Sequence, residues 1–237
     1  MNCKNCNTEF NSKFCPECGH PAQLKRINGH YILHEIEHVL HFERGILYTV
    51  RELITNPGQN IRNYFSENRS RLVKPVIFII ITSLIYTLIT SFFHIEDKYV
   101  KFDGGENTAT FKIFQWITGH YGYANMIMGI FITFWIKVFF RKSAYNFFEI
   151  LILLCFVMGM GMLIFSVFSL IEGIFKVHLM NIGGIVGVLY CTWAIGHFFG
   201  KDRIINYVKA FSCYILGMIT FSLIAILLGS LIDMIKH

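Results

Sequence analysis

Two pairs of cysteines stand near the start of the chain, at Cys3-x-x-Cys6 and Cys15-x-x-Cys18. Two such pairs so close in sequence can place four thiolates tetrahedrally around one Zn²⁺, which is the geometry of a closed structural site. About twenty residues cannot bury enough apolar surface to fold alone, so we expect the metal to supply most of the folding free energy, on the order of 10 kcal/mol. The spacing therefore predicts a zinc ribbon over residues 1–22, with zinc as a structural cofactor and the four cysteines as its ligands.

Two other uses of paired cysteines fit this chain less well. A disulfide framework requires an oxidising compartment, and we expect no export because no signal peptide precedes Cys3. A redox-active Cys-x-x-Cys would begin a helix in a βαβ context, and the surrounding sequence shows no such pattern. Structural zinc is the interpretation we favour.

A second group of possible metal ligands lies further along. The segment His34-Glu35-Ile36-Glu37-His38 matches His-Glu-x-x-His, in which two imidazoles one helical turn apart hold zinc and the glutamate acts as general base. On a helix, the histidines of this segment would lie on one side, opposite its apolar face. A second metal site would consist of His34, Glu35, His38 and His41.

A solvated or interfacial helix explains the same histidines without a metal. No third ligand is evident on a following helix, and the motif precedes the first apolar span rather than lying inside one. We therefore favour a histidine-bearing surface helix, keep a second metal site or partner contact as the alternative, and assign no catalytic residue. An enzyme is the less favoured class.

The composition is that of a membrane protein. Hydrophobic residues make up 54% of the chain and charged residues 15%, whereas soluble domains carry about 25% charged residues. The apolar runs are long enough to cross a bilayer. We predict an all-α integral membrane helical bundle of about five transmembrane helices, preceded by the small zinc ribbon. The predicted transmembrane domain is 75–237, with spans at about 75–94, 120–140, 147–171, 179–199 and 208–232.

The charges predict an orientation for these spans. With the N-terminus inside, sixteen Lys and Arg residues fall on the cytoplasmic side and five on the other. Cytoplasmic loops carry such an excess, so we expect a cytoplasmic N-terminus, an external loop over 95–119 and an external C-terminus. The net charge of +6 then reflects topology and contact with anionic lipid rather than nucleic-acid binding. We expect no nucleic-acid partner.

Residues 23–74 connect the zinc ribbon to the first span. The pattern predicts short amphipathic helices over 31–44, 46–55 and 59–67, with a turn at Asn56-Pro57-Gly58. Helices of this kind in front of a span are typical of the cytoplasmic membrane surface.

Several short motifs follow one another in the first 95 residues. They are Phe14-Cys15-Pro16-x-Cys18-Gly19, His34…His38…His41, Glu43-Arg44-Gly45, Tyr48 to Leu53, Asn56-Pro57-Gly58, Ile61-Arg62-Asn63-Tyr64, Asn68-Arg69 and Lys74-Pro75. In this succession the chain resembles an uncharacterised family of bacterial membrane proteins, found mainly in the Bacteroidetes and known only as a domain of unknown function. The resemblance implies zinc binding and a membrane location, here the bacterial cytoplasmic (inner) membrane, and it brings no established activity.

The function that these observations favour is recruitment or sensing. We expect a non-enzymatic membrane protein whose cytoplasmic zinc ribbon and surface helices bind a protein partner, while the bundle contacts the lipid bilayer. A transporter, channel or lipid-handling protein is the first alternative, although the spans show no convincing charged group deep inside them. A membrane-surface metallohydrolase that uses His34, Glu35 and His38 is the second.

Overall fold

The structure is a computed structural model. It describes residues 2, 3, 6, 8, 9, 11–18, 45–95 and 108–236. The chain divides into two compact units, Met1–His41 and Phe42–His237, which are described separately below. The smaller unit carries four of the seven cysteines, and the larger one carries the described helices.

In the described part of the larger unit, every element of regular secondary structure is an α-helix. Its helices are α2 (Ile46–Thr55), α3 (Pro57–Ser66), α4 (Pro75–Phe93), α6 (Ala109–Gly119), α7 (Tyr121–Phe139), α8 (Phe147–Phe175), α9 (Met180–Gly200) and α10 (Ile204–Lys236). Five of them are long and apolar enough to cross a membrane, namely α4, α7, α8, α9 and α10. The predicted all-α membrane bundle with about five spans is confirmed.

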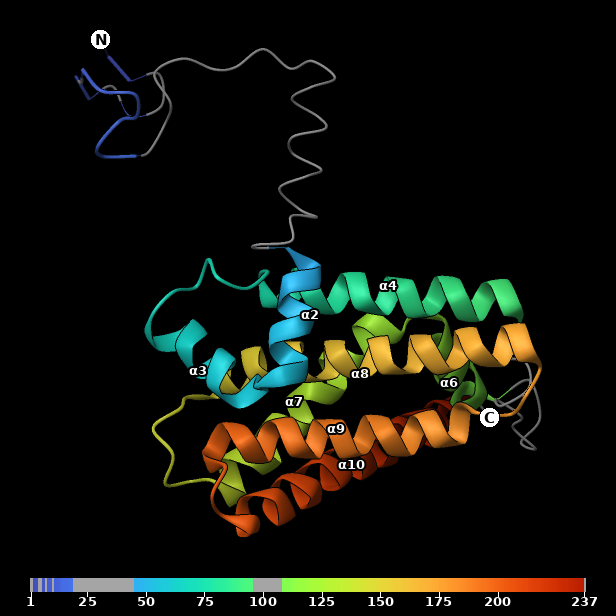
Figure 1. Cartoon of the computed structure of the whole chain (residues 1–237). Helices are drawn as coiled ribbons and strands as arrows, with labels where there is room; N and C mark the ends of the chain where they lie inside the picture. The colour runs from blue at the N-terminus through green and yellow to red at the C-terminus, as the bar shows by residue number, and fades with distance from the viewer. Residues whose placement is uncertain are drawn as a thin grey trace. The chain divides into compact units, whose positions relative to one another are not determined.

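Helix α8 is the centre of the bundle, and α4, α7 and α9 pack around it (Figure 1). Helix α10 lies against α7 and α9 and leaves most of its surface exposed. In the core, the fully buried ring of Phe156 on α8 lies 5.9 Å from that of Phe78 on α4. Gly159 of α8 has no side chain, and this gives the Phe78 ring room to pack. A Cβ at Gly159 would lie only 2.7 Å from a carbon of that ring.

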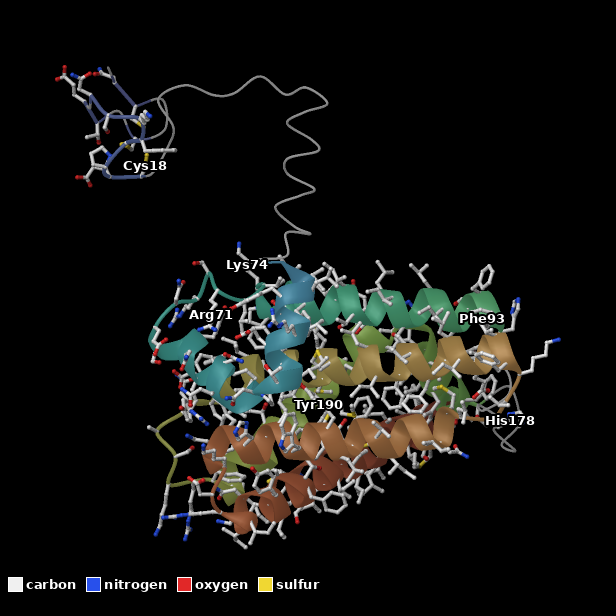
Figure 2. All side chains as sticks on the ribbon, viewed as in Figure 1. Cys18, Arg71, Lys74, Phe93, His178 and Tyr190 are labelled. Atoms are coloured by element: carbon white, nitrogen blue, oxygen red, sulfur yellow. The ribbon has the colours of Figure 1, made fainter. Side chains whose placement is uncertain are left out.

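Helices α2 and α3, with the connection 67–74 that follows them, cover one end of the bundle, and we call this assembly the cap. Pro57 begins α3 without loss of a hydrogen bond, because the first helical N–H has no partner inside the helix. The cap is built on apolar contacts, since Leu53 of α2 and Ile61 of α3 are fully buried in the main core. Figure 2 shows Arg71 and Lys74 at the capped end of the bundle and Phe93 and His178 at the opposite end.

The segment predicted as an external loop over 95–119 contains helix α6, so that prediction is wrong for residues 109–119. The side chain of Thr108 accepts the N–H of Phe111 at 3.3 Å and starts the helix. The N–H of Ala109 donates to Asp233 Oδ1 of α10 at 2.8 Å. Tertiary contact with the far part of α10 thus supports this short helix.

Between α6 and α7 the chain breaks at His120, where the backbone is not helical. Just after the break, Gly122 comes so close to α4 that a Cβ there would lie 3.3 Å from the Cβ of Ser83. Ser83 is the ninth of the nineteen residues of α4. The break between α6 and α7 therefore lies beside the middle of α4.

Candidate metal centre and helical cap

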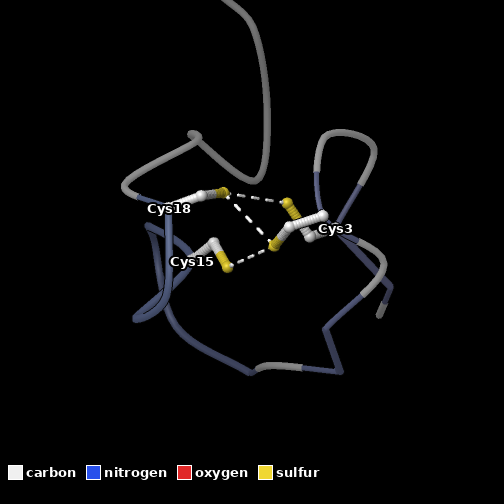
Figure 3. Close-up of side chains that lie close together, drawn as sticks. Cys3, Cys15 and Cys18 are labelled. Atoms are coloured by element: carbon white, nitrogen blue, oxygen red, sulfur yellow. Dashed lines mark hydrogen bonds between the residues drawn. The ribbon is translucent and has the colours of Figure 1, made fainter.

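The four N-terminal cysteines form one cluster (Figure 3). Their sulfur atoms all lie within 4.8 Å of one another. The Sγ atoms of Cys3 and Cys18 are 3.4 Å apart, those of Cys6 and Cys15 are 3.5 Å apart, and those of Cys6 and Cys18 are 3.4 Å apart. A Zn²⁺ with Zn–S bonds of about 2.3 Å separates tetrahedral sulfurs by about 3.8 Å. The four side chains therefore fit a tetrahedral metal ion.

The backbone around the cluster folds into two short turns. The N–H of Cys3 donates to the carbonyl oxygen of Thr8 at 3.0 Å, and Asn2 pairs with Glu9 across the same turn. Cys3 and Cys15 are buried, whereas Cys6 and Cys18 are exposed. The sulfur separations of 3.4 to 3.5 Å are well beyond an S–S bond of about 2.05 Å, so these contacts are not disulfides.

Cys6 has the electrostatics of a metal ligand. Its Sγ lies 3.4 Å from the Thr8 hydroxyl oxygen, and hydrogen bonding by that hydroxyl is the main cause that lowers the pKa of the Cys6 thiol to about 6. The Thr8 backbone and the neighbouring Cys18 lower this pKa further. Since the thiolate is the form that binds metal, the cluster is suited to hold a cation at neutral pH.

The second metal site predicted from His34, Glu35, His38 and His41 lies outside the described residues. It stays a prediction.

In the cap, α3 is fastened to the last turn of α9. Arg62 Nη1 donates to the main-chain oxygens of His197 at 2.9 Å and Phe198 at 2.7 Å. The N–H of Gly58 donates to His197 Nδ1 at 3.3 Å. The C-terminal carbonyls of a helix have no partners of their own and carry partial negative charge. The Arg62 guanidinium and the N-terminus of α3 both lie against the negative end of α9. The contact therefore joins two helix ends of opposite polarity.

The connection from α3 to α4 is fastened to α2. The N–H of Val73 donates to the hydroxyl of Thr49, which is fully buried, at 3.0 Å. Arg71 donates from Nε to the Tyr48 hydroxyl at 3.0 Å and from Nη2 to Glu52 Oε2 at 2.8 Å. The Tyr48 hydrogen bond is the main cause that raises the pKa of Arg71, and Glu52 adds to it. The first span thus starts from a fixed position against α2.

The end of α2 is closed by groups from two other helices. Asn60 Nδ2 of α3 donates to the carbonyl oxygen of Glu52 at 2.8 Å, and the Tyr190 hydroxyl of α9 donates to that of Leu53 at 3.0 Å. The Glu52 carbonyl oxygen also accepts the N–H of Asn56 at 3.0 Å, whereas the Leu53 carbonyl lies in the last turn, where a helix has no partner of its own to offer. The cap is therefore one structure with α9, formed by polar contacts around an apolar centre.

An aromatic contact holds α3 to the centre of the bundle. The ring of Tyr64 meets that of Phe156 edge-on at 5.3 Å. Burial raises the pKa of the Tyr64 phenol, which keeps it neutral in this position. Phe65 packs against Phe198 in the same way at 6.0 Å. These ring contacts pack α3 against both α8 and α9.

Sequence reasoning missed one buried acid at the opposite end. Glu172 of α8 is 1% exposed, and its Oε2 accepts the N–H groups of Leu179 at 2.9 Å and Met180 at 3.1 Å. It thereby caps the N-terminus of α9, whose own N-cap residue makes no side-chain hydrogen bond. The sequence predicts a span that ends at residue 171, just before Glu172, whereas α8 continues to Phe175.

Comparison with protein families gives one match. A family described as a protein of unknown function (DUF3667) matches residues 43–87, which cover α2, α3 and most of α4. The DUF3667 match therefore includes the cap and the start of the first span, and the cysteine cluster lies before it. No curated protein and no solved structure matches the chain.

Proposed function

We propose that this is a non-enzymatic integral membrane protein whose zinc ribbon recruits or senses a protein partner in the cytoplasm. The observation that carries the proposal is the four-cysteine cluster in a compact unit of its own, apart from the helical unit. A closed site with four protein ligands has no open position for a substrate, which favours a structural metal over a catalytic one. Structural zinc modules present rigid surfaces for recognition, and Phe14, 60% exposed beside the cluster, offers an apolar contact.

The distribution of charge supports a cytoplasmic cap. The described basic side chains gather at the capped end, at Arg51, Arg62, Arg69, Arg71, Lys74, Lys137, Arg141, Lys142, Lys201, Arg203 and Lys209. The opposite end has Lys112 and Lys176 among the described side chains. An excess of Lys and Arg in the loops next to spans is typical of the cytoplasmic side. Since the N-terminal unit precedes the cap in sequence, our proposal has the ribbon on the cytoplasmic side of a bacterial inner membrane.

Crosslinking in cells tests the recruitment proposal. A photoreactive amino acid at position 14 of the full chain should capture one or a few cytoplasmic proteins. Cys3→Ser combined with Cys18→Ser, or deletion of residues 1–22 with the photoreactive group placed at the new N-terminus, should remove these products. A matched photoreactive group at Leu88, which is 61% exposed on α4, should capture lipid in all variants. An unchanged set of protein products after deletion of the ribbon would exclude the proposal.

One observation favours a second function, transport or lipid handling. The chain breaks between α6 and α7 beside the middle of α4, and interrupted helices near the middle of the membrane form the binding sites of many transporters. Ion-flux and lipid-transfer assays on proteoliposomes test this alternative. Rates at the level of protein-free vesicles across both panels would exclude it.

A further inference from the structure

Helix α2 has an apolar face that the rest of the cap does not cover. Leu47 and Ile54 are each 57% exposed, and Arg51 between them is exposed as well. At about 100° per residue, these three side chains fall within a sector of about 60°. The buried residues of α2, Thr49 and Leu53, lie on the other side of the helix. We call Leu47, Arg51 and Ile54 the outer face of α2.

The neighbouring helix α3 has a different outer side. Its exposed side chains are those of Gln59 and Ser66, and Glu67, which follows it, is exposed too. No large apolar side chain of α3 is exposed. The two helices belong to one cap, and the same surroundings would favour outer sides of the same kind. An apolar side on α2 and a polar side on α3 therefore indicate that α2 contacts lipid and α3 contacts water.

The contacts with α9 show that α2 lies deeper in the bundle than α3. The Tyr190 hydroxyl of α9 donates to the Leu53 carbonyl of α2. The α9 carbonyls that contact α3 are those of His197 and Phe198, in the last turn at the capped end. Tyr190 precedes His197 by seven residues, which is about 10 Å along the helix axis. Helix α2 thus meets α9 closer to the bilayer centre than α3 does.

The start of the first span gives the level at which α2 lies. Helix α4 has 19 residues, and its length of about 28 Å is close to the thickness of the hydrocarbon layer. Pro75, its first residue, therefore lies near the boundary between acyl chains and headgroups. The N–H of Val73 donates to Thr49 of α2 at 3.0 Å, so α2 lies beside this boundary. Figure 1 shows α2 running across the direction of α4, as a helix in the plane of the membrane surface does.

Arg51 gives the outer face a positive charge at this level. It forms no ion pair with any residue that the structure describes, whereas Arg71 pairs with Glu52 on another side of α2. A long arginine stem packs along apolar surface while its guanidinium stays at the polar boundary. The guanidinium also matches a phosphate group, to which it donates two hydrogen bonds. The outer face is therefore complementary to a phospholipid, with acyl chains beside its apolar side chains and a phosphate beside Arg51.

We propose that the outer face of α2 inserts into the leaflet at the capped end of the bundle. Leu47 and Ile54 lie among the upper parts of the acyl chains, and Arg51 binds the phosphate of an anionic phospholipid. Helix α3 stays in water. Because Thr49 joins α2 to the start of the first span, the inserted helix fixes the depth of that span. The surface lies outside the zinc ribbon, so it neither requires nor excludes partner recruitment.

Photocrosslinking of the full chain in nanodiscs tests the insertion. The nanodiscs hold equal amounts of phosphatidylglycerol and phosphatidylcholine, and a diazirine amino acid replaces Leu47, Ile54 or Ser66 in turn. We expect phospholipid adducts at Leu47 and Ile54, whereas the group at Ser66 on α3 should react with water. Leu88, 61% exposed on α4, is the control that contacts lipid. Reaction of the α2 positions with water or with a second protein chain, or equal lipid adducts at Ile54 and Ser66, would overturn the proposal.

The phosphate contact is tested by the choice of lipid at position 54. Phosphatidylglycerol adducts should exceed phosphatidylcholine adducts there, and Arg51→Gln should lower their ratio about fivefold, as loss of one basic residue near an anionic surface gives. Arg51→Lys should keep most of the ratio because it keeps the charge. Arg141→Gln, at an exposed basic position in the connection from α7 to α8, is the matched control and should leave the ratio unchanged.

The unfolding temperature separates lipid binding from a structural role. Arg51→Gln should unfold at the same temperature as the wild type in detergent, because the outer face makes no contact in the core of the cap. An unchanged lipid ratio in Arg51→Gln, or an equal decrease in Arg141→Gln, would exclude the contact between Arg51 and phosphate. A decrease of the ratio together with a lower unfolding temperature would show that Arg51 acts through the fold, and it would overturn the proposal as well.

Discussion

Arg62 reaches across from α3 and donates to the main-chain oxygen of Phe198, 2.7 Å away on α9. The donor is Arg62 Nη1, which also donates to the carbonyl oxygen of His197. Arg62 Nη2 donates to Gln59 Oε1 at 2.7 Å. The contact thus recognises the end of a helix rather than a particular side chain. It makes Arg62 the main polar link between the cap and the bundle.

Arg62→Met should loosen the cap. It removes charge-assisted hydrogen bonds to carbonyls that α9 cannot pair itself, and we expect a loss of about 1.5–3 kcal/mol in the free energy of unfolding. Arg62→Lys should recover part of it, because a lysine keeps the charge but not the forked geometry. Unfolding in mixed detergent micelles measures both. Arg141→Met, at an exposed position, is the control and should change little.

Gly58→Ala should displace α3 from α9. A Cβ at Gly58 would lie 2.5 Å from the main-chain carbon of His197, and a backbone atom cannot move aside as a flexible side chain does. We expect a loss of about 2 kcal/mol or more in the free energy of unfolding. Gly119→Ala is the matched control, because no atom lies within 4 Å of its Cβ position. An equal effect of the two substitutions would contradict this account of the contact.

Thr49→Val should weaken the junction between α2 and the first span. Valine has nearly the same shape but leaves the N–H of Val73 without its partner, at an expected cost of about 1–3 kcal/mol. Thr55→Val tests the specificity of this effect, because the exposed Thr55 hydroxyl only bonds carbonyls of its own helix. Thermal unfolding should distinguish them, with a clear decrease for Thr49→Val and a change within about 0.5 kcal/mol for Thr55→Val.

The metal content should be one zinc per chain, bound by the four cysteines. Elemental analysis of the purified full chain measures it, and Cys15→Ser should lower it because one thiolate ligand is lost. The unfolding temperature of the helical unit should stay the same in this variant, since the cluster lies in the other compact unit. Two metal ions per chain, reduced to one by His34→Ala, would instead show the second site and raise the metallohydrolase alternative.

Reporter fusions should show that the capped end of the bundle faces the cytoplasm. Alkaline phosphatase is active only outside the cytoplasm, so fusions after Lys142 and Arg203 should be inactive and a fusion at the C-terminus should be active. Green fluorescent protein exported in unfolded form does not fluoresce, so it should give the reverse pattern. Opposite results at all three positions would invert the topology that the basic residues predict.

The long helices were predictable because composition alone decides them. An uninterrupted apolar run such as that in α8 has no soluble alternative, and the cysteine spacing leaves few arrangements other than one cluster. Helix α6 was missed because Lys112 and Gln115 give it the appearance of a polar loop, while contact with Asp233 far along the chain supports it. The role of Arg62 was equally hidden, since nothing near it in sequence indicates the end of α9.

The cap has a consequence for the order in which the protein can be made. Arg62 and His197 are 135 residues apart, so the binding partner of α3 leaves the ribosome only after the first three spans have been synthesised. Until then the polar groups of α3 must be held by water or by a chaperone. The cap can therefore dock on α9 only late in biogenesis, after the fourth span has been synthesised.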